Sequence, residues 1–140
     1  MVMEQLAVEI VGLCREYGEC RVEVERMEEA RRVKNALESV CAMARQRLDI
    51  SDPALLLALL DACEVTRDEG MLQEVLDVVG RNLDRLAVSA ESVKLLACCY
   101  YYVEEEECAE RARRMLEELR KMGRGEEELA DVETILEELT

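Results

Sequence analysis

Apolar residues recur at spacings of three and four along most of this 140-residue chain, and this period restricts it to a fold of packed helices. In the stretch from Val22 to Leu48, the apolar positions are Met27, Ala30, Val33, Leu37, Val40, Cys41, Ala44 and Leu48. Nowhere do β-branched or aromatic residues alternate with polar ones over a useful length, as a half-buried strand requires. With one Pro and six Gly, the chain has few interruptions. We therefore predict an all-α fold.

Seven helices are predicted from the start and stop signals. The first covers about 3 to 17 and ends at Gly18, and the second spans 22 to 48. Asp52 and Pro53 mark the start of the third, because Asp caps a first turn and Pro costs nothing at its first position. This helix reaches about Val65 and is apolar on nearly every side, so we expect it to be central and buried. The remaining elements are a turn at 68–70, a helix over 71–86 with a weak point at Gly80, a helix capped by Ser89, a helix ended by Gly123, and a terminal helix over 125–140.

The apolar pattern coincides with itself when the segment from Leu56 is moved forward by 37 residues. The coinciding pairs are Leu56 with Val93, Leu59 with Leu96, Cys63 with Tyr100, Met71 with Cys108, Leu72 with Ala109, Val75 with Ala112, Val78 with Met115, and Val79 with Leu116. A period of this size, with one hairpin per unit, is typical of a helical solenoid. We predict one domain over 1–140, with three stacked antiparallel hairpins at about 1–50, 51–88 and 89–123 and a capping helix over 125–140.

The third predicted hairpin resembles a tetratricopeptide repeat. Val93, Leu96, Ala97, Tyr100 and Ala109 match that family's order of large, large, small, aromatic and alanine positions. The following stretch, 112–123, is similar to the pentatricopeptide pattern. Together the likeness covers about 70 residues, and it implies tetratricopeptide-like packing, in which the first helix of each unit lines a concave groove.

As a whole, the chain also resembles the soluble part of the trypanosomatid MIX family, whose members are all-helical, membrane-anchored mitochondrial proteins. The likeness consists of length, acidity and Cys-rich helical hairpins. It implies association with a respiratory or maintenance complex of the mitochondrial inner membrane, through an N-terminal anchoring segment that precedes this chain. The first residues, 1–14, have the pattern of neither a signal peptide nor a membrane span.

The charge balance bears on partners. Asp and Glu number 33 against 18 Lys and Arg, a net charge of −15. Such a surface repels nucleic acid and anionic membranes and favours a basic or apolar protein segment, although solubility alone also explains it. We expect no nucleic-acid partner and no direct membrane insertion.

Neither a metal site nor catalysis is expected. The seven Cys form no C-x-x-C pair and His is absent, so the thiols are interpreted as core residues in a reducing intracellular compartment, with no metal or cofactor. The run of four Glu at 104–107 is expected to form a turn and a first helical turn. Asp61 and Glu64 stand on the most apolar helix, where a structural role is favoured over acid–base work. We predict that the chain is not an enzyme.

The groove implied by the tetratricopeptide resemblance gives candidate partner-binding residues. They are Asp61, Glu64 and Val65 in one unit and Lys94, Cys98, Tyr101 and Tyr102 in the next. Tyr is favoured at interfaces because it offers a large contact area with little rotamer entropy. Tyr100 is expected to belong to the core, which makes Tyr101 and Lys94 the stronger candidates.

Three functions remain open. The leading hypothesis is an adaptor or assembly factor that docks a helix or extended peptide of a partner protein. The alternatives are an acidic, tetratricopeptide-like secretion chaperone and a homo-oligomeric structural subunit.

Overall fold

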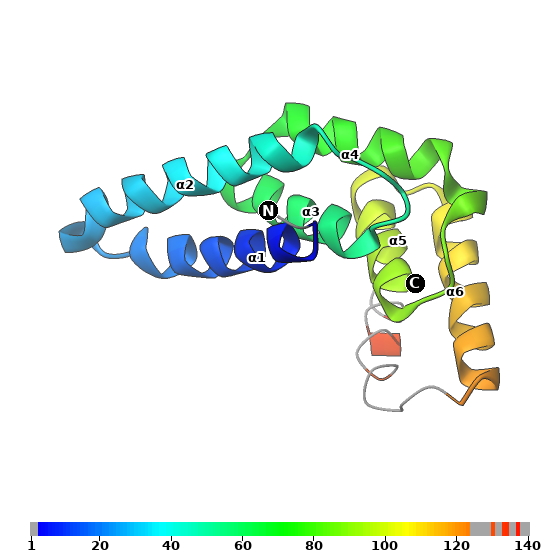
Figure 1. Ribbon diagram of the computed structural model, residues 1–140. Coiled ribbons are helices and arrows are strands. Elements are labelled where there is room, and N and C mark those ends of the chain that lie inside the picture. The colour runs from blue at the N-terminus through cyan, green and yellow to red at the C-terminus, as the bar shows by residue number, and fades with distance from the viewer. Residues whose placement is uncertain (1–2, 124–129, 131–132, 135–136, 138–140) are drawn as a thin grey trace. The chain divides into compact units, whose positions relative to one another are not determined.

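The protein is all-helical in the part of the chain that the structure describes, which is residues 3–123, 130, 133–134 and 137 of a computed structural model. This confirms the predicted fold class. The described elements, drawn in Figure 1, are α1 (Met3–Cys20), a 3₁₀ helix η1 (Val24–Arg26), α2 (Met27–Arg45), α3 (Pro53–Thr66), α4 (Glu69–Arg81), a 3₁₀ helix η2 (Leu83–Arg85), α5 (Ala90–Val103) and α6 (Glu106–Lys121). No helix of this described part is long and apolar enough to cross a membrane.

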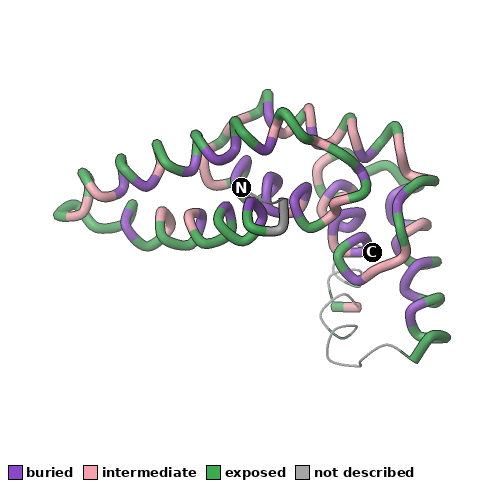
Figure 2. The backbone as a smooth tube through the Cα atoms, viewed as in Figure 1, coloured by how far each residue is buried: buried purple, intermediate pink, exposed green. Residues whose placement is uncertain are grey.

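The chain divides into two compact units, Met1–Val75 and Leu76–Thr140, with the division inside α4. In the first unit, α1 packs against both α2 and α3, and α2 also contacts α3. Buried side chains recur along one face of α1 and of α2, whereas α3 is buried over most of its circumference (Figure 2). The fully enclosed residues of this core include Leu6, Ile10, Leu37, Leu56 and Leu59. The apolar sequence of α3 therefore does place it at the centre of its unit, as predicted.

One ion cluster fastens the end of α2 to the start of α4. The Nε of Arg45 donates to an oxygen of Glu74 at 2.9 Å, and a guanidinium nitrogen of Arg45 lies 3.6 Å from Asp68. The hydrogen bond from Arg45 holds the pKa of the Glu74 carboxyl below its ordinary value. Ala44, the last buried residue of α2, stands directly before Arg45. Burial and ion pairing therefore hold the same end of α2 in place.

The second unit is built around α5 and α6, which pack against each other. Its core includes Leu95 and Leu96 from α5 and Ala112 and Leu119 from α6, all almost fully enclosed. The acidic run 104–107 connects the two helices and begins α6, as predicted. Glu104 is left-handed, Glu105 is the N-cap residue of α6, and Glu106 and Glu107 belong to its first turn. Its acids stand at the positive end of the α6 dipole, where negative charge is stabilising.

Helix ends repeat with the 37-residue period of the apolar pattern. Asp52 caps α3 by accepting from the amide of Leu55 at 3.2 Å, and Ser89, 37 residues later, caps α5 by accepting from the amide of Ser92 at 3.1 Å. Both helices have 14 residues. They end at Arg67 (φ 59°) and Glu104 (φ 53°), again 37 residues apart and both in the left-handed conformation that satisfies the last carbonyls of a helix.

Some predicted boundaries are wrong. Gly18 does not end the first helix, which continues to Cys20, because one Gly inside a helix costs only about 1 kcal/mol and the packing of Cys20 outweighs it. The turn predicted at 68–70 lies earlier: Arg67 ends α3, the Asp68 carboxylate accepts from the amide of Met71 at 3.0 Å, and Gly70 is helical.

Three further positions differ from the prediction. Met27 is 61 % exposed, because it begins α2 and the first buried residue of that helix is Ala30. The second helix ends at Arg45 rather than at 48, and the fourth ends at Arg81 and is followed by η2. The apolar residues of the predicted terminal helix, Leu129, Val132, Ile135, Leu136 and Leu139, lie outside the residues that the structure describes.

Candidate functional site

One accessible stripe runs along α5, which is otherwise largely buried. Ala90, Ser92, Val93, Leu95, Leu96, Ala97 and Cys99 are enclosed. The residues predicted to bind a partner, Lys94, Cys98, Tyr101 and Tyr102, follow each other at spacings of four, three and one, and this places them on one side of the helix. Lys94, Cys98 and Tyr102 are half-buried, and Tyr101 is exposed. The helix therefore presents a cation at one end of this stripe and two aromatic rings at the other.

The tyrosines of α5 differ in their surroundings. Tyr101 is 69 % exposed, and its ring meets the ring of Tyr102 edge to face, with centroids 5.3 Å apart. Tyr100, which was predicted to lie in the core, is only half-buried, because its hydroxyl reaches Glu106 at 3.4 Å. The nearby Glu106 carboxylate raises the pKa of the Tyr100 hydroxyl. Tyr101 thus offers the largest aromatic contact area on this stripe.

The predicted residues of α3 also share one side of their helix. Asp61 and Glu64 are exposed and Val65 is half-buried, while Leu60 and Ala62 beside them are enclosed. The Asp61 side chain reaches the surface, yet the packing around it removes part of its hydration and raises the pKa of its carboxyl, and Glu64 raises this pKa further. The α3 and α5 residues belong to different units. Their union in one groove stays a prediction.

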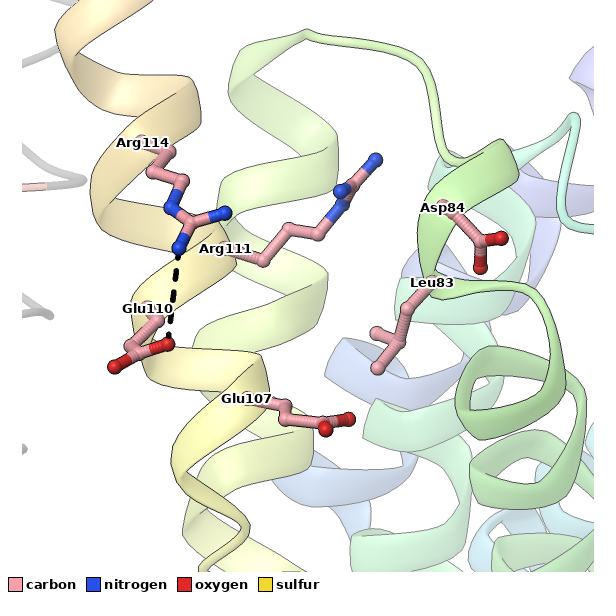
Figure 3. Close-up of a pocket in the computed structure, with 6 residues that line it drawn as sticks. All are labelled: Leu83, Asp84, Glu107, Glu110, Arg111 and Arg114. Atoms are coloured by element: carbon pink, nitrogen blue, oxygen red, sulfur yellow. Dashed lines mark ion pairs between the residues drawn. The ribbon is translucent and has the colours of Figure 1, made fainter.

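A surface pocket of about 300 Å³ lies between η2 and α6 in the second unit. Figure 3 shows Glu107 and Arg111 extending from α6 toward Leu83 and Asp84 of η2. Arg114 pairs with Glu110 at 3.9 Å, one turn apart on α6. The Nε of Arg111 is buried and makes no hydrogen bond within the described residues. With three carboxylates and two guanidiniums, this pocket is nearly balanced in charge and selects for neither sign of ligand.

The thiols contribute to packing. Six of the seven cysteines are buried, Cys98 is half-buried, and all seven are free. Burial raises the pKa of Cys14 to about 11 and that of Cys41 and Cys63 to about 12, with a smaller contribution from Asp61 for Cys14. A thiol with so high a pKa stays protonated and is a poor nucleophile and metal ligand. Among the described residues, no group of three or more Cys, Asp or Glu could hold a metal ion.

The turn between α1 and α2 carries a surface that the sequence analysis did not single out. Val22, Val24 and Met27 are 76 %, 81 % and 61 % exposed there. Three large apolar side chains exposed within six residues form more than the scattered single exposures that are normal on a protein surface. The sequence could have signalled them, because Val22 and Val24 are two residues apart and do not follow the spacing of three and four that the buried positions of α2 keep.

Comparisons with protein-family models, curated proteins and solved structures find no match to this chain.

Proposed function

We propose that this chain is a non-enzymatic protein–protein interaction module, an adaptor or assembly factor that binds a helix or extended peptide along the accessible stripe of α5. The observation that carries this proposal is Tyr101, an aromatic side chain left 69 % exposed on a helix that is otherwise mostly buried. An exposed Tyr whose ring contacts a second ring has the composition of a binding hot spot, because it offers area and a hydroxyl at little entropic cost.

The net charge of −15 favours a basic partner segment, since the field of the whole chain steers cations toward it. In the tetratricopeptide-like packing that we propose for the hairpins, α3 would add Asp61 and Glu64 to the same groove. The 37-residue repetition of helix ends supports this arrangement. The likeness to the MIX family supports a mitochondrial inner-membrane complex as the setting.

The proposal is tested by comparing how three variants recover a partner. The tagged full-length protein is purified from its native cells in mild detergent, and the amount of each co-purifying protein is measured for wild type, Tyr101→Ala, Lys94→Ala and Val8→Ala. Val8→Ala is the matched control, because it truncates an apolar side chain that is similarly exposed, at 74 %, on α1 of the other unit.

Truncation of a hot-spot Tyr costs about 2 kcal/mol or more, so Tyr101→Ala should lower affinity for the direct partner about 30-fold. Val8→Ala should leave recovery unchanged, and the unfolding midpoints of all variants should agree. Equal recovery by Tyr101→Ala and wild type would reject this stripe. Recovery of this chain alone would reject the adaptor role in favour of a homo-oligomer.

A further inference from the structure

A second pocket, of about 320 Å³, lies on the first unit where the end of α1 meets the start of α2. Tyr17 and Arg21 line it from the α1 side, and Met27, Ala30, Arg31 and Lys34 line it from α2. On α2 these positions follow spacings of three, one and three and therefore lie along one side of the helix. The pocket thus has three cations around three apolar side chains.

Three of the residues that line this pocket, Tyr17, Met27 and Ala30, are apolar or aromatic. Ala30 is buried, the Tyr17 ring is half-buried, and Met27 is exposed with Val24 nearby in η1. Met adapts its shape to different partners and is common on surfaces that bind protein segments. A single large apolar side chain of a ligand would be buried here against Tyr17, Ala30 and Met27.

The cations of the pocket have no acidic partners among the residues that the structure describes. Within the described residues, Arg21, Arg31 and Lys34 take part in no ion pair, although acids outnumber bases in the chain by 33 to 18. By contrast, Arg26, which does not line the pocket, pairs with both Glu23 and Glu29. The Arg21 guanidinium lies 5.9 Å from the centre of the Tyr17 ring, a cation–π contact that leaves its nitrogens able to donate.

We propose that this pocket docks an acidic segment of a partner protein, with one large apolar side chain against Tyr17, Ala30 and Met27 and carboxylates on Arg21, Arg31 and Lys34. The charges of the pocket determine the sign of the ligand locally, because salt at physiological strength screens charges beyond about 8 Å. A membrane or a nucleic acid presents an extended anionic surface, which the whole chain, with its net charge of −15, would repel. A short acidic peptide interacts only with the charges near the pocket.

This inference goes beyond the function proposed above, because it concerns another unit, another partner and the opposite ligand charge. A chain with both surfaces would bind two different proteins. The two are tested independently, since the residues of one surface are not shared by the other.

The test uses the purified full-length chain and random 16-residue peptides displayed on phage. Peptides that also bind the variant Arg31→Glu/Lys34→Glu are removed first, and the rest are selected on wild type. Affinities of the enriched peptides are then measured by fluorescence anisotropy. The control variant is Arg15→Glu/Arg32→Glu. It reverses two exposed charges on α1 and α2, the helices that line the pocket, at positions outside the pocket, and it changes the net charge by the same amount.

We expect enriched peptides to combine Asp or Glu with one large apolar residue. Arg31→Glu/Lys34→Glu should weaken them at least tenfold and the control less than twofold. Met27→Ser, which changes no charge, should also weaken them and thus serves as a second variant.

Four outcomes would overturn the proposal. They are enrichment of basic or uncharged peptides, equal weakening by both charge variants, specific binding of phosphatidylserine vesicles that Arg31→Glu/Lys34→Glu abolishes, and a wild-type dimer in sedimentation that this variant converts to monomer. Failure to enrich any peptide would reject this pocket and leave the α5 proposal standing, because peptides that bind along α5 also bind Arg31→Glu/Lys34→Glu and are removed first.

Discussion

Alkaline pH should destabilise this protein steeply, because three buried thiols are held protonated in the first unit. Cys14, Cys41 and Cys63 are 9 %, 4 % and 4 % exposed and come from α1, α2 and α3. The loss of hydration on burial is the main cause of their raised pKa values. In the unfolded chain the same thiols ionise near their ordinary pKa of 9.0. Above this pH the folded chain therefore keeps thiol protons that the unfolded chain releases.

The sign and size follow from linkage between protonation and folding. A raised folded pKa gives stability that is complete below the unfolded pKa of 9.0 and is lost as the pH rises toward about 11 for Cys14 and about 12 for the other two. At pH 10 each thiol has lost about 1.4 kcal/mol, since one pKa unit corresponds to about 1.36 kcal/mol. The three thiols together therefore lower the free energy of unfolding by about 4 kcal/mol between pH 8 and pH 10.

Urea unfolding followed by far-UV circular dichroism at pH 8, 9 and 10, in the presence of a non-thiol reductant, measures this loss. Cys63→Ala provides the control, because it removes one of the buried thiols and should make the free energy of unfolding less dependent on pH, whatever its cost at pH 8. A free energy of unfolding that falls by less than about 1 kcal/mol over this range would refute the reasoning. So would a Cys63→Ala variant with the same pH dependence as wild type.

Three smaller changes test the backbone and the ion cluster, each by urea unfolding at neutral pH. Gly18→Ala should raise the free energy of unfolding by about 0.5–1 kcal/mol, because Gly18 is helical and an added methyl meets no atom within 4 Å. Gly123→Ala should lower the free energy of unfolding by about 1 kcal/mol, because φ there is +68°. A change of the same sign for both substitutions would contradict this reasoning. Asp52→Ala should cost about 1 kcal/mol through loss of the α3 cap, with Asp52→Asn nearly neutral. A double-mutant cycle of Arg45→Met and Glu74→Gln should give a coupling of about 0.5–1.5 kcal/mol that shrinks in 1 M salt, and an additive cycle would show that the pair contributes nothing.

The fold class and several helix ends could be predicted because their causes are local. Asp52 and Ser89 form caps with amides only three residues away, so the sequence around each contains the whole interaction. The end of α3 at Arg67 could not be predicted in this way. A left-handed helix end usually has Gly, and the nearest one, Gly70, is helical.

One of the two candidate surfaces could be predicted from the sequence and the other could not. The helical period places Lys94 and Tyr101 on one side of α5, and burial of the neighbouring residues leaves that side accessible. The cationic pocket could not be predicted, because it combines Tyr17 of α1 with Arg31 of α2 and depends on how these two helices pack. Side-chain placement likewise decides that Arg26 pairs with Glu29, whereas Arg31 pairs with no acid in the described part of the chain.

The matched helix ends constrain changes of chain length more than they constrain substitutions. One residue inserted into α3 would rotate the rest of that helix by about 100° and move both its apolar side and the left-handed Arg67 out of place. The same holds for α5 and its left-handed C-cap residue Glu104. Related chains should therefore differ freely in side chains across 52–67 and 89–104 but keep the number of residues, and gain or lose residues instead in the connection 82–88.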